Sequence, residues 1–334
     1  MSSASSDRTS WPSPAVSLNG SIEPLRDALA ARLSVVLLTY NCSHRIATTL
    51  KHLIALEVPV VVVDNGSTDG VDAVIAHYPE VTVVRLPHNI GAAARNVGLE
   101  RTTTPYVAFC DDDGWYERDG LVLAADLLDR YPRLGLVNAR ILVRDEEGLD
   151  VVSAEMAASP VPDRAGIPGP VLLSFMAGAA VVRRESYRES GGYDERFFIG
   201  GEEETLAVPM VRRGWQMRYV PEVVMHHYPS VANATSLRHV GLRNTVVNAW
   251  LHRRFGSALR WTVFSLADAP KNRSYVRGLV LLTRAVPWIV RERDPIPREL
   301  DGDLRLLDER RFRARRRVWT RREQMGRSAY PPTG

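Results

Sequence analysis

The pattern of apolar and polar positions changes abruptly near residue 33. Residues 1–32 are polar and rich in Ser and Pro, which predicts a disordered or loosely docked leader. From Leu33 onward, short apolar runs alternate with segments whose apolar residues recur at helical spacing. The runs predict strands at 33–38, 58–63, 81–86, 106–110 and 135–143, and the segments between them predict helices at 44–56, 71–77, 91–100 and 121–131. We therefore expect an α/β fold with a mostly parallel, buried central sheet and helices on both of its faces.

This alternation weakens after Arg144. A loop rich in Pro and Gly covers 159–170, and two apolar runs, 171–182 and 217–225, flank an acidic patch. From residue 236 the chain is helical in pattern and increasingly basic. We therefore expect a helical, Arg-rich C-terminal region over 236–334.

Polar clusters directly follow three of the predicted strands. They are Thr39-Tyr40-Asn41, the turn 64–67 that begins with Asp64 and Asn65, and the triplet Asp111-Asp112-Asp113. In parallel sheets, ligands bind beyond the carboxyl ends of the strands. Three clusters at one edge of one sheet therefore predict a binding site.

The aspartate triplet is a candidate metal site. Adjacent carboxylates repel one another, and hard oxygen ligands suit Mg²⁺ or Mn²⁺, usually with substrate phosphates completing the coordination. The alternative is a solvated acidic turn that caps the next helix. We favour the metal because the triplet follows a buried strand in a βαβ series.

Two other turns carry candidate ligand-binding residues. Asp64 is placed to accept a hydrogen bond from a base or ribose, while Ser67 or Thr68 in the same turn can cap the next helix. Gly91 and Arg95 open another predicted helix, and a helix N-terminus favours anions. The dinucleotide fingerprint G-x-G-x-x-G is absent there, so a tightly packed helix with a solvated Arg is an equal alternative.

Two further clusters lie in the second half of the chain. Glu202-Glu203-Glu204 follows two glycines, and adjacent carboxylates raise at least one pKa, as a general base requires. A charged helix N-terminus explains the same composition equally well. His226 and His227 end the apolar run 217–225, where a histidine is either a metal ligand or, more commonly, a satisfied surface residue.

Composition and charge indicate the class of protein, its compartment and its partners. The 334 residues are 45% apolar and 25% charged, as in ordinary soluble globular proteins. The chain has only two cysteines, Cys42 and Cys110, so no disulfide framework is expected. We therefore expect the protein in a reducing compartment, the cytoplasm. The net charge is +4, but residues 303–327 alone hold ten Arg against four acidic residues, so the remainder is near −2 (4 minus 6). Nucleic acid is therefore not an expected partner of the main domain.

Membrane insertion is not predicted from the apolar stretches. Residues 1–21 lack the apolar region of a secretory signal, and the longest apolar stretch, 171–182, is too short to cross a bilayer. The segment Arg310 to Arg322 has eight arginines interleaved with Phe312, Val318 and Trp319. This pattern predicts peripheral contact with an anionic membrane at its inner face, or else a helix packed on the domain with a solvated basic side.

Taken together, the motifs resemble the family 2 glycosyltransferases, which have the GT-A fold. They are SVVLLTYN (34–41), VVVDNGSTDG (61–70), HNIGAAARNVG (88–98), the aspartate triplet, GGYDERFFIGGEEETLAVPMVRRGW (191–215) and VPEVVMHHYPS (220–230). The likeness covers about Leu33 to Asn244 and is closest to branches that build rhamnosyl- and galactofuranosyl-containing glycans. It implies a catalytic domain at 33–235, with a nucleotide-binding half at 33–144 and an acceptor half at 145–235.

The resemblance also implies a role for individual residues. The nucleotide-binding residues would be Thr39, Tyr40, Asn41, Asp64, Asn65, Gly91, Arg95, Asp111 and Asp112. Asp64 would meet the uracil imide, and Asp111 would lie near the ribose. The metal ligands would be Asp113, Asp111 and His226, with His227 as a further candidate, and the acceptor side would include Trp115, Gly178 and Arg243.

The general base implied by the resemblance is Glu203, which takes the place of the family's catalytic Asp. The family usually has Glu-Asp where this chain has Glu202-Glu203, so Glu202 is the alternative. A second acidic residue of the family pattern, two positions later, is replaced here by Thr205.

The implied activity is transfer, with inversion, of a sugar from a UDP- or dTDP-sugar to a hydroxyl of a glycan, lipid-linked or small-molecule acceptor, assisted by Mg²⁺ or Mn²⁺. The sugar, the acceptor and the oligomeric state stay open. One alternative is a nucleotidyltransferase that makes sugar nucleotides, although its Gly-rich, Lys-containing loop is missing after the first strand. Another is nucleic-acid binding through the Arg-rich tail, which leaves the carboxylate clusters unexplained.

Overall fold

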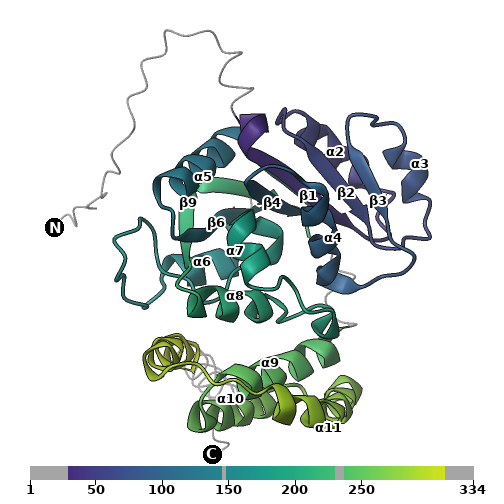
Figure 1. The fold of residues 1–334 in the computed structure, drawn as a ribbon. Coiled ribbons are helices and arrows are strands. Elements are labelled where there is room, and N and C mark those ends of the chain that lie inside the picture. The colour runs from purple at the N-terminus through teal and green to yellow at the C-terminus, as the bar shows by residue number, and fades with distance from the viewer. Residues whose placement is uncertain (1–28, 145–147, 230–236, 313–334) are drawn as a thin grey trace, which may run out of the picture.

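A single β-sheet forms the centre of the molecule (Figure 1). The computed structural model describes residues 29–144, 148–229 and 237–312. Within them the strand order is β3-β2-β1-β4-β8-β6-β9-β5, and β7 pairs with β6.

The first half of the chain has the alternation that the apolar pattern predicts. Its elements are β1 (Leu33–Thr39), α2 (Ile46–Ile54), β2 (Val60–Asp64), α3 (Val71–Ile75), β3 (Thr82–Arg85), η1 (Gly91–Ala93), α4 (Ala94–Arg101), β4 (Tyr106–Asp111), β5 (Gly114–Tyr116), α5 (Arg118–Arg130) and β6 (Leu134–Val143). β1 runs parallel to β2 and β4, and β2 runs parallel to β3. The predicted parallel sheet is therefore confirmed for these four strands.

The second half of the sheet is mixed. Its elements are β7 (Gly148–Leu149), α6 (Val151–Ala157), η2 (Ala177–Ala179), β8 (Ala180–Arg183), α7 (Arg184–Glu189), η3 (Glu195–Phe197), α8 (Glu203–Arg212) and β9 (Gln216–His227). β8 is antiparallel to β4 and β6, β5 is antiparallel to β9, and β9 is parallel to β6. The parallel direction of β4 is thus kept by β6 and β9, whereas β8, β7 and β5 run antiparallel to their neighbours. β8 is formed only by the last residues of the apolar run 171–182 and the Arg183 that follows them.

Apolar side chains cover both faces of the sheet. In β1, Val35 and Leu37 join a core that includes residues of α2, α3 and α5, whereas Val36 joins the core on the other face with residues of α4, α7 and α8. This is the alternation of successive strand side chains. Leu29 is buried in the first core, and Arg32 pairs with Asp126 and Asp129, so the described end of the expected leader is docked.

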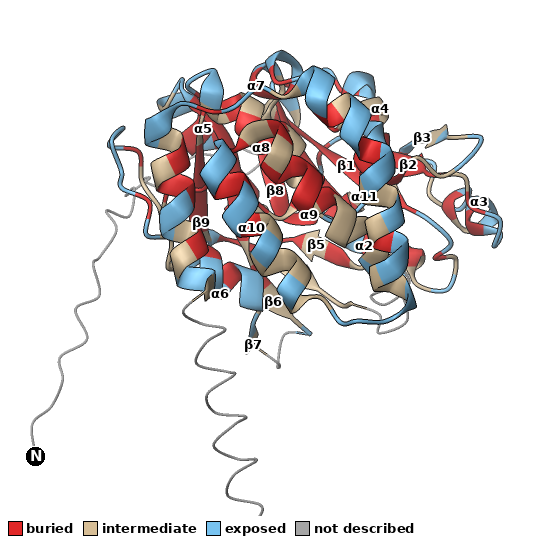
Figure 2. Ribbon diagram, turned by 90° about the horizontal axis from the view of Figure 1, so that it is seen from below, coloured by how far each residue is buried: buried red, intermediate tan, exposed pale blue. Residues whose placement is uncertain are grey.

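Helices of the C-terminal region form a layer beneath the sheet domain (Figure 1). They are α9 (Arg238–His252), α10 (Phe255–Asp268), α11 (Arg273–Glu292) and a last described helix over 298–312. Phe197 packs with Val247 and Leu251 of α9 and Ile289 of α11, which joins this layer to the domain. Figure 2 views the molecule from this layer's side, where α10 and α11 present exposed faces.

The sequence also led to expectations about the cysteines, membrane-spanning helices and the basic segment 310–322. Cys42 and Cys110 are both free and buried. In the described ranges, every helix is either too short or too polar to span a bilayer. Most of the basic segment 310–322 lies outside the described residues.

Candidate functional site

The sheet register brings the predicted strand-end residues to one edge. Thr39 of β1 lies opposite Asp64 of β2, and Leu38 lies opposite Asp111 of β4. The three polar clusters therefore converge, as expected for strand ends of a parallel sheet.

Within the first cluster, the three residues face different surroundings. The buried Thr39 hydroxyl lies 2.8 Å from Cys42 Sγ, so it is turned into the protein. The Tyr40 side chain is 46% exposed at the edge of the sheet. Asn41 has a φ of 51°, and its Oδ1 accepts a 2.9 Å hydrogen bond from the Thr68 N–H, which joins the first and second clusters.

Asp64 is buried, and its two carboxylate oxygens have different partners. Its Oδ1 accepts a 2.9 Å hydrogen bond from the Ser67 N–H. Its Oδ2 has no hydrogen-bond partner among the described residues, although Arg85 Nε lies 3.3 Å away. Oδ2 therefore has an ionic partner but no hydrogen bond among the described residues, and it can still accept one from a ligand.

Asn65 joins the end of β2 to the turn before α4. Its Nδ2 donates to Asn89 Oδ1 and to the Gly91 carbonyl, and its Oδ1 accepts from the Ile90 N–H. Gly91 has a φ of +66°, and a Cβ at this position would lie 2.1 Å from the Phe198 carbonyl oxygen. Only glycine fits there, so the turn before α4 touches the backbone at Phe198.

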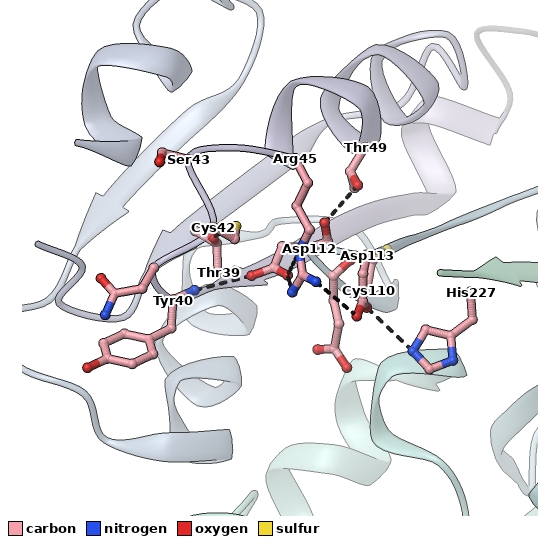
Figure 3. A network of polar contacts seen from close by, with 12 residues as sticks. Thr39, Tyr40, Cys42, Ser43, Arg45, Thr49, Cys110, Asp112, Asp113 and His227 are labelled. Carbon is pink, nitrogen blue, oxygen red and sulfur yellow. Dashed lines mark hydrogen bonds and ion pairs between the residues drawn. The ribbon is translucent and has the colours of Figure 1, made fainter. Parts of the chain in front are cut away.

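Each carboxylate of the aspartate triplet faces a cation of the protein. Asp111 pairs with Arg95 of α4. Asp112 accepts from Arg45, with Nη2 2.5 Å and Nε 3.1 Å from its Oδ1. Asp113 Oδ1 lies 3.5 Å from His227 Nε2, and Asp113 Oδ2 lies 3.7 Å from Arg45 Nη1 (Figure 3). Part of the repulsion within the triplet is therefore offset by Arg45, which the sequence interpretation missed because it precedes α2 without any distinctive motif.

Arg95 is the buried positive charge of the site. It is 4% exposed, and its guanidinium carbon lies 5.9 Å from the centre of the Tyr193 ring. Burial lowers the pKa of Arg95, but Asp111 and Glu202 outweigh burial and hold it above its ordinary value, so the side chain stays charged. Its Nε has no hydrogen-bond partner among the described residues.

The acidic patch begins α8 and faces this arginine. Glu202 is the residue before the helix, and it is buried with no hydrogen-bond partner for Oε2 in the described part of the chain. Burial raises the pKa of Glu202. Burial and the adjacent Glu202 raise the pKa of Glu203 to about 8, although Arg95 opposes the shift. Glu203 is thus a carboxylate with the basicity that proton removal from a hydroxyl requires.

The two histidines at the end of β9 point in opposite directions. His226 lies opposite Trp115 in the β5–β9 pair, and its Nε2 is 3.0 Å from Glu117 Oε1. His227 lies opposite Gly114 and faces Asp113, and this hydrogen bond raises the pKa of His227. Since successive strand side chains alternate between faces, only one of the two reaches the triplet. The structure therefore places His227, rather than His226, beside Asp113.

The three residues expected on the acceptor side are not grouped together. A Cβ at Gly178 would lie 2.3 Å from Asp111 Oδ2, so Gly178 borders the carboxylate edge. Trp115 stacks on His52 at 3.9 Å and on Tyr228 at 5.0 Å between ring centres. Arg243 of α9 donates a 2.6 Å hydrogen bond to the Arg196 carbonyl.

Comparison with known proteins relates the first part of the chain to one family model. Residues 34–191 match the family model described as Glycosyl transferase family 2. The chain is therefore similar to this family over the matched segment, which holds the strand-end clusters but ends before Glu202.

Two relatives from Mycobacterium tuberculosis differ in how they align. A pre-mycofactocin glycosyltransferase is 35% identical over 196 residues, which cover 55% of this chain and 39% of the relative. An N-acetylglucosaminyl-diphospho-decaprenol L-rhamnosyltransferase is 27% identical over 279 residues, covering 69% of this chain and 89% of the relative. The chain thus spans about two fifths of the length of the first relative and most of the second.

Two solved structures are similar in fold. The mannosyltransferase PcManGT from Pyrobaculum calidifontis, in complex with GDP-Man and Mn²⁺, has a TM-score of 0.50 at 19% identity and covers 83% of this chain and 86% of its own. GalNAc-T7 with UDP, GalNAc and Mn²⁺ has a TM-score of 0.52 at 14% identity, covering 79% of this chain and 56% of its own. The sheet with helices on both faces is therefore the GT-A fold.

Proposed function

We propose that this protein is an inverting glycosyltransferase that moves a sugar from a UDP- or dTDP-sugar to an acceptor hydroxyl. The observation that carries the proposal is the position of Arg95. Its guanidinium pairs with Asp111 at the end of β4 and interacts electrostatically with Glu202 and Glu203 at the start of α8. The carboxylates of a donor site and the candidate base thus meet around one buried cation.

The donor base and ribose are assigned to the ends of β1 and β2. Oδ2 of Asp64, which pairs with Arg85 but has no hydrogen bond among the described residues, accepts the imide N–H that uracil and thymine share. The exposed ring of Tyr40 offers a stacking surface, and Asp111, at the end of the neighbouring strand β4, is assigned to the ribose. Since both bases present the same imide, UDP and dTDP donors are both accommodated at this position.

A divalent metal fits the Asp113–His227 pair. An oxygen and an imidazole nitrogen 3.5 Å apart are suitable ligands for Mn²⁺ or Mg²⁺ when substrate phosphates supply further oxygens. Among the described residues, no three His, Cys, Asp or Glu side chains form a ready metal site. In this proposal Asp113 and His227 hold the ion, with Asp111 adjacent, and the bound ion supplies charge neutralisation for the departing diphosphate.

Glu203 removes the proton from the acceptor hydroxyl. The hydroxyl oxygen attacks the anomeric carbon from the face opposite the diphosphate, and the bond from that carbon to the phosphate oxygen breaks. The diphosphate leaves with the bonding electrons, and the hydroxyl proton goes to the Glu203 carboxylate. One displacement inverts the anomeric carbon, and Glu202 is the alternative base because it is also close to Arg95.

The acceptor is proposed to be a glycan or a lipid-linked sugar, as in synthesis of a cell-wall or other polysaccharide. The supporting relative is the rhamnosyltransferase, whose name describes an acceptor attached to diphospho-decaprenol.

Peripheral contact with an anionic membrane is also proposed, and α11 supports it. Val276, Val280, Val286 and Val290 are exposed along this helix. At about 100° per residue, Arg273, Arg277, Arg284 and Arg291 fall within about 40° of one another, beside the valine stripe. An exposed apolar stripe next to a basic row suits the surface of an anionic bilayer.

A donor screen tests the proposed activity. Nucleoside diphosphate release is measured for UDP- and dTDP-sugars with Mn²⁺, Mg²⁺ or chelator, in the presence of lipid-linked and free glycan acceptors. We expect metal-dependent release for one donor class. Pyrophosphate release from a nucleoside triphosphate and a sugar 1-phosphate would instead establish the nucleotidyltransferase alternative.

A further inference from the structure

The segment from Arg196 to Gly201 leads directly into the acidic patch and has an unusual backbone. Phe198 has a φ of 60° and a ψ of −76°, and Gly200 and Gly201 have φ values of 82° and 91°. A positive φ is accessible to glycine, but in a bulky residue such as phenylalanine it is a strained conformation. Such a backbone persists only where the surrounding structure holds it.

Every carbonyl of this segment accepts a hydrogen bond from another element. The Arg196 carbonyl accepts from Arg243 Nη2 at 2.6 Å, and the Phe198 carbonyl accepts from the Ala92 N–H at 2.7 Å. The remaining four are held by two amides of α9. Asn244 Nδ2 lies 2.7, 3.2 and 2.8 Å from the carbonyl oxygens of Phe197, Ile199 and Gly200, and Asn248 Nδ2 lies 2.6 Å from that of Gly201.

Asn244 and Asn248 are suited to this contact by spacing and burial. They are four residues apart, so they lie on the same face of α9, and both are fully buried. A Cβ at Gly201 would lie 3.4 Å from Asn244 Cβ, which shows how closely the helix and the segment approach. The Nδ2 groups of both amides bond the segment, whereas their Oδ1 atoms have no hydrogen-bond partner among the described residues.

We propose that Asn244 and Asn248 are positioning residues for the general base. They hold the strained segment so that Glu202 and Glu203, which follow it, face Arg95 and the acceptor hydroxyl. The α9 helix lies outside the matched family segment at 34–191, so this chain completes its active site with an element of its C-terminal region. The inference rests on the proposed function because it takes Glu203 as the base.

The test compares Asn244→Ala and Asn248→Ala with a matched control, Ser257→Ala. Ser257 Oγ donates a buried hydrogen bond to Asp301 within the C-terminal region, away from the segment. We expect both Asn variants to lower kcat at least about tenfold, since a small displacement of a catalytic group is costly. We expect the KM for the donor to stay within about twofold, because the donor residues lie on other elements, and the control to retain kcat.

Hydrogen exchange of the amides at 197–204 gives a readout that does not depend on turnover. The Asn variants should accelerate exchange there, whereas Ser257→Ala should not. Asn248→Ala frees a single carbonyl and serves as the milder variant if Asn244→Ala does not fold. Unchanged exchange in the Asn variants would overturn the proposal, as would faster exchange with kcat equal to that of the control.

The same design separates this inference from the proposed function. If Glu203→Gln transfers sugar at the rate of the unmodified protein, the assignment of the base is wrong. The exchange measurement still reports whether α9 holds the segment.

Discussion

The Nε2 of His227 lies 3.5 Å from Asp113 Oδ1, while its chain neighbour His226 pairs with Glu117. The arrangement follows from the β5–β9 pairing, in which Gly114 is opposite His227 and Trp115 is opposite His226. Gly114 is essential to this close pairing, because a Cβ there would lie 2.7 Å from the His226 carbonyl oxygen.

The two histidines should therefore respond differently to substitution. His227→Ala removes an imidazole beside Asp113 and should weaken metal-dependent donor binding at least about tenfold, as loss of a ligand or its partner typically does. His226→Ala is the matched control and should change donor affinity little. Calorimetric titration of the donor with and without Mn²⁺ distinguishes them, and the reverse ranking would transfer the ligand role to His226.

The carboxylate of Glu203 should determine the pH dependence of transfer. Burial and Glu202 raise its pKa to about 8, and a base acts only when it is deprotonated. Transfer should therefore increase about tenfold per pH unit below 8 and level off above it. Initial rates of transfer between pH 5.5 and 9.5 measure this increase.

Glu203→Gln should abolish the increase of transfer with pH and reduce transfer at least about a hundredfold, while donor binding persists. Glu202→Gln should have the smaller effect on the rate. If the two variants exchange these outcomes, Glu202 is the base.

Gly178 should tolerate no side chain. Its missing Cβ would lie 2.3 Å from Asp111 Oδ2, so Gly178→Ala must displace the carboxylate that Arg95 holds, and we expect donor affinity and transfer to fall together. Gly256→Ala is the control, since the space around that helical glycine is open and the change should stabilise the protein by about 0.5–1 kcal/mol. Thermal unfolding and donor titration of both variants make the comparison, and unimpaired binding by Gly178→Ala would contradict it.

The valine stripe of α11 should determine binding to anionic vesicles. Val280→Asp combined with Val290→Asp places charge in the stripe and should abolish co-sedimentation, whereas Val151→Asp, on a valine of α6 that is as exposed as Val290, should not. Raising the salt to 1 M should release the unmodified chain, since screening then shortens to about 3 Å. If the unmodified chain, the double valine variant and Val151→Asp sediment equally with anionic vesicles, the valine stripe does not bind the membrane. That result would favour the alternative of a helix packed on the domain.

A truncation that tests the basic segment should end after Phe312, so that it keeps the helix over 298–312. Residues of the helix over 298–312 are structural: Leu304 packs with Val208 of α8, and Asp308 forms a buried ion pair with Arg253. Removing them would expose apolar surface and leave Arg253 without its partner, and this would confuse loss of folding with loss of membrane contact.

The apolar pattern was sufficient to predict the first half of the fold and the edge where the site lies. Runs such as 58–63 are too short for helices and too apolar for exposed strands, and polar residues follow them directly. The run 171–182 carried no such information, because its length suits either element, and it forms loop, η2 and β8.

The features of the site that the sequence did not predict depend on contacts between residues far apart in the chain. Arg45 pairs with Asp112, which lies 67 positions later, and no local motif indicates that pairing. The choice between His226 and His227 depends on the register of β9, which is irregular where it pairs with Ala139 and Arg140. Asn244 and Asn248 lie in a helix whose sequence has no catalytic motif, so only their contact with the glycine segment reveals a role.

The Phe198 carbonyl bonds to Ala92 of the first half, and its neighbours bond to Asn244 of the C-terminal region. Three stretches that are far apart in sequence therefore share one short piece of backbone. In chimeras between this protein and its relatives, exchanging 34–191 alone would separate the turn at Gly91 from the segment it was fitted to. Exchanges that keep 88–96, 193–204 and 238–252 from the same parent should retain turnover, whereas crossovers between them should fold and yet transfer poorly.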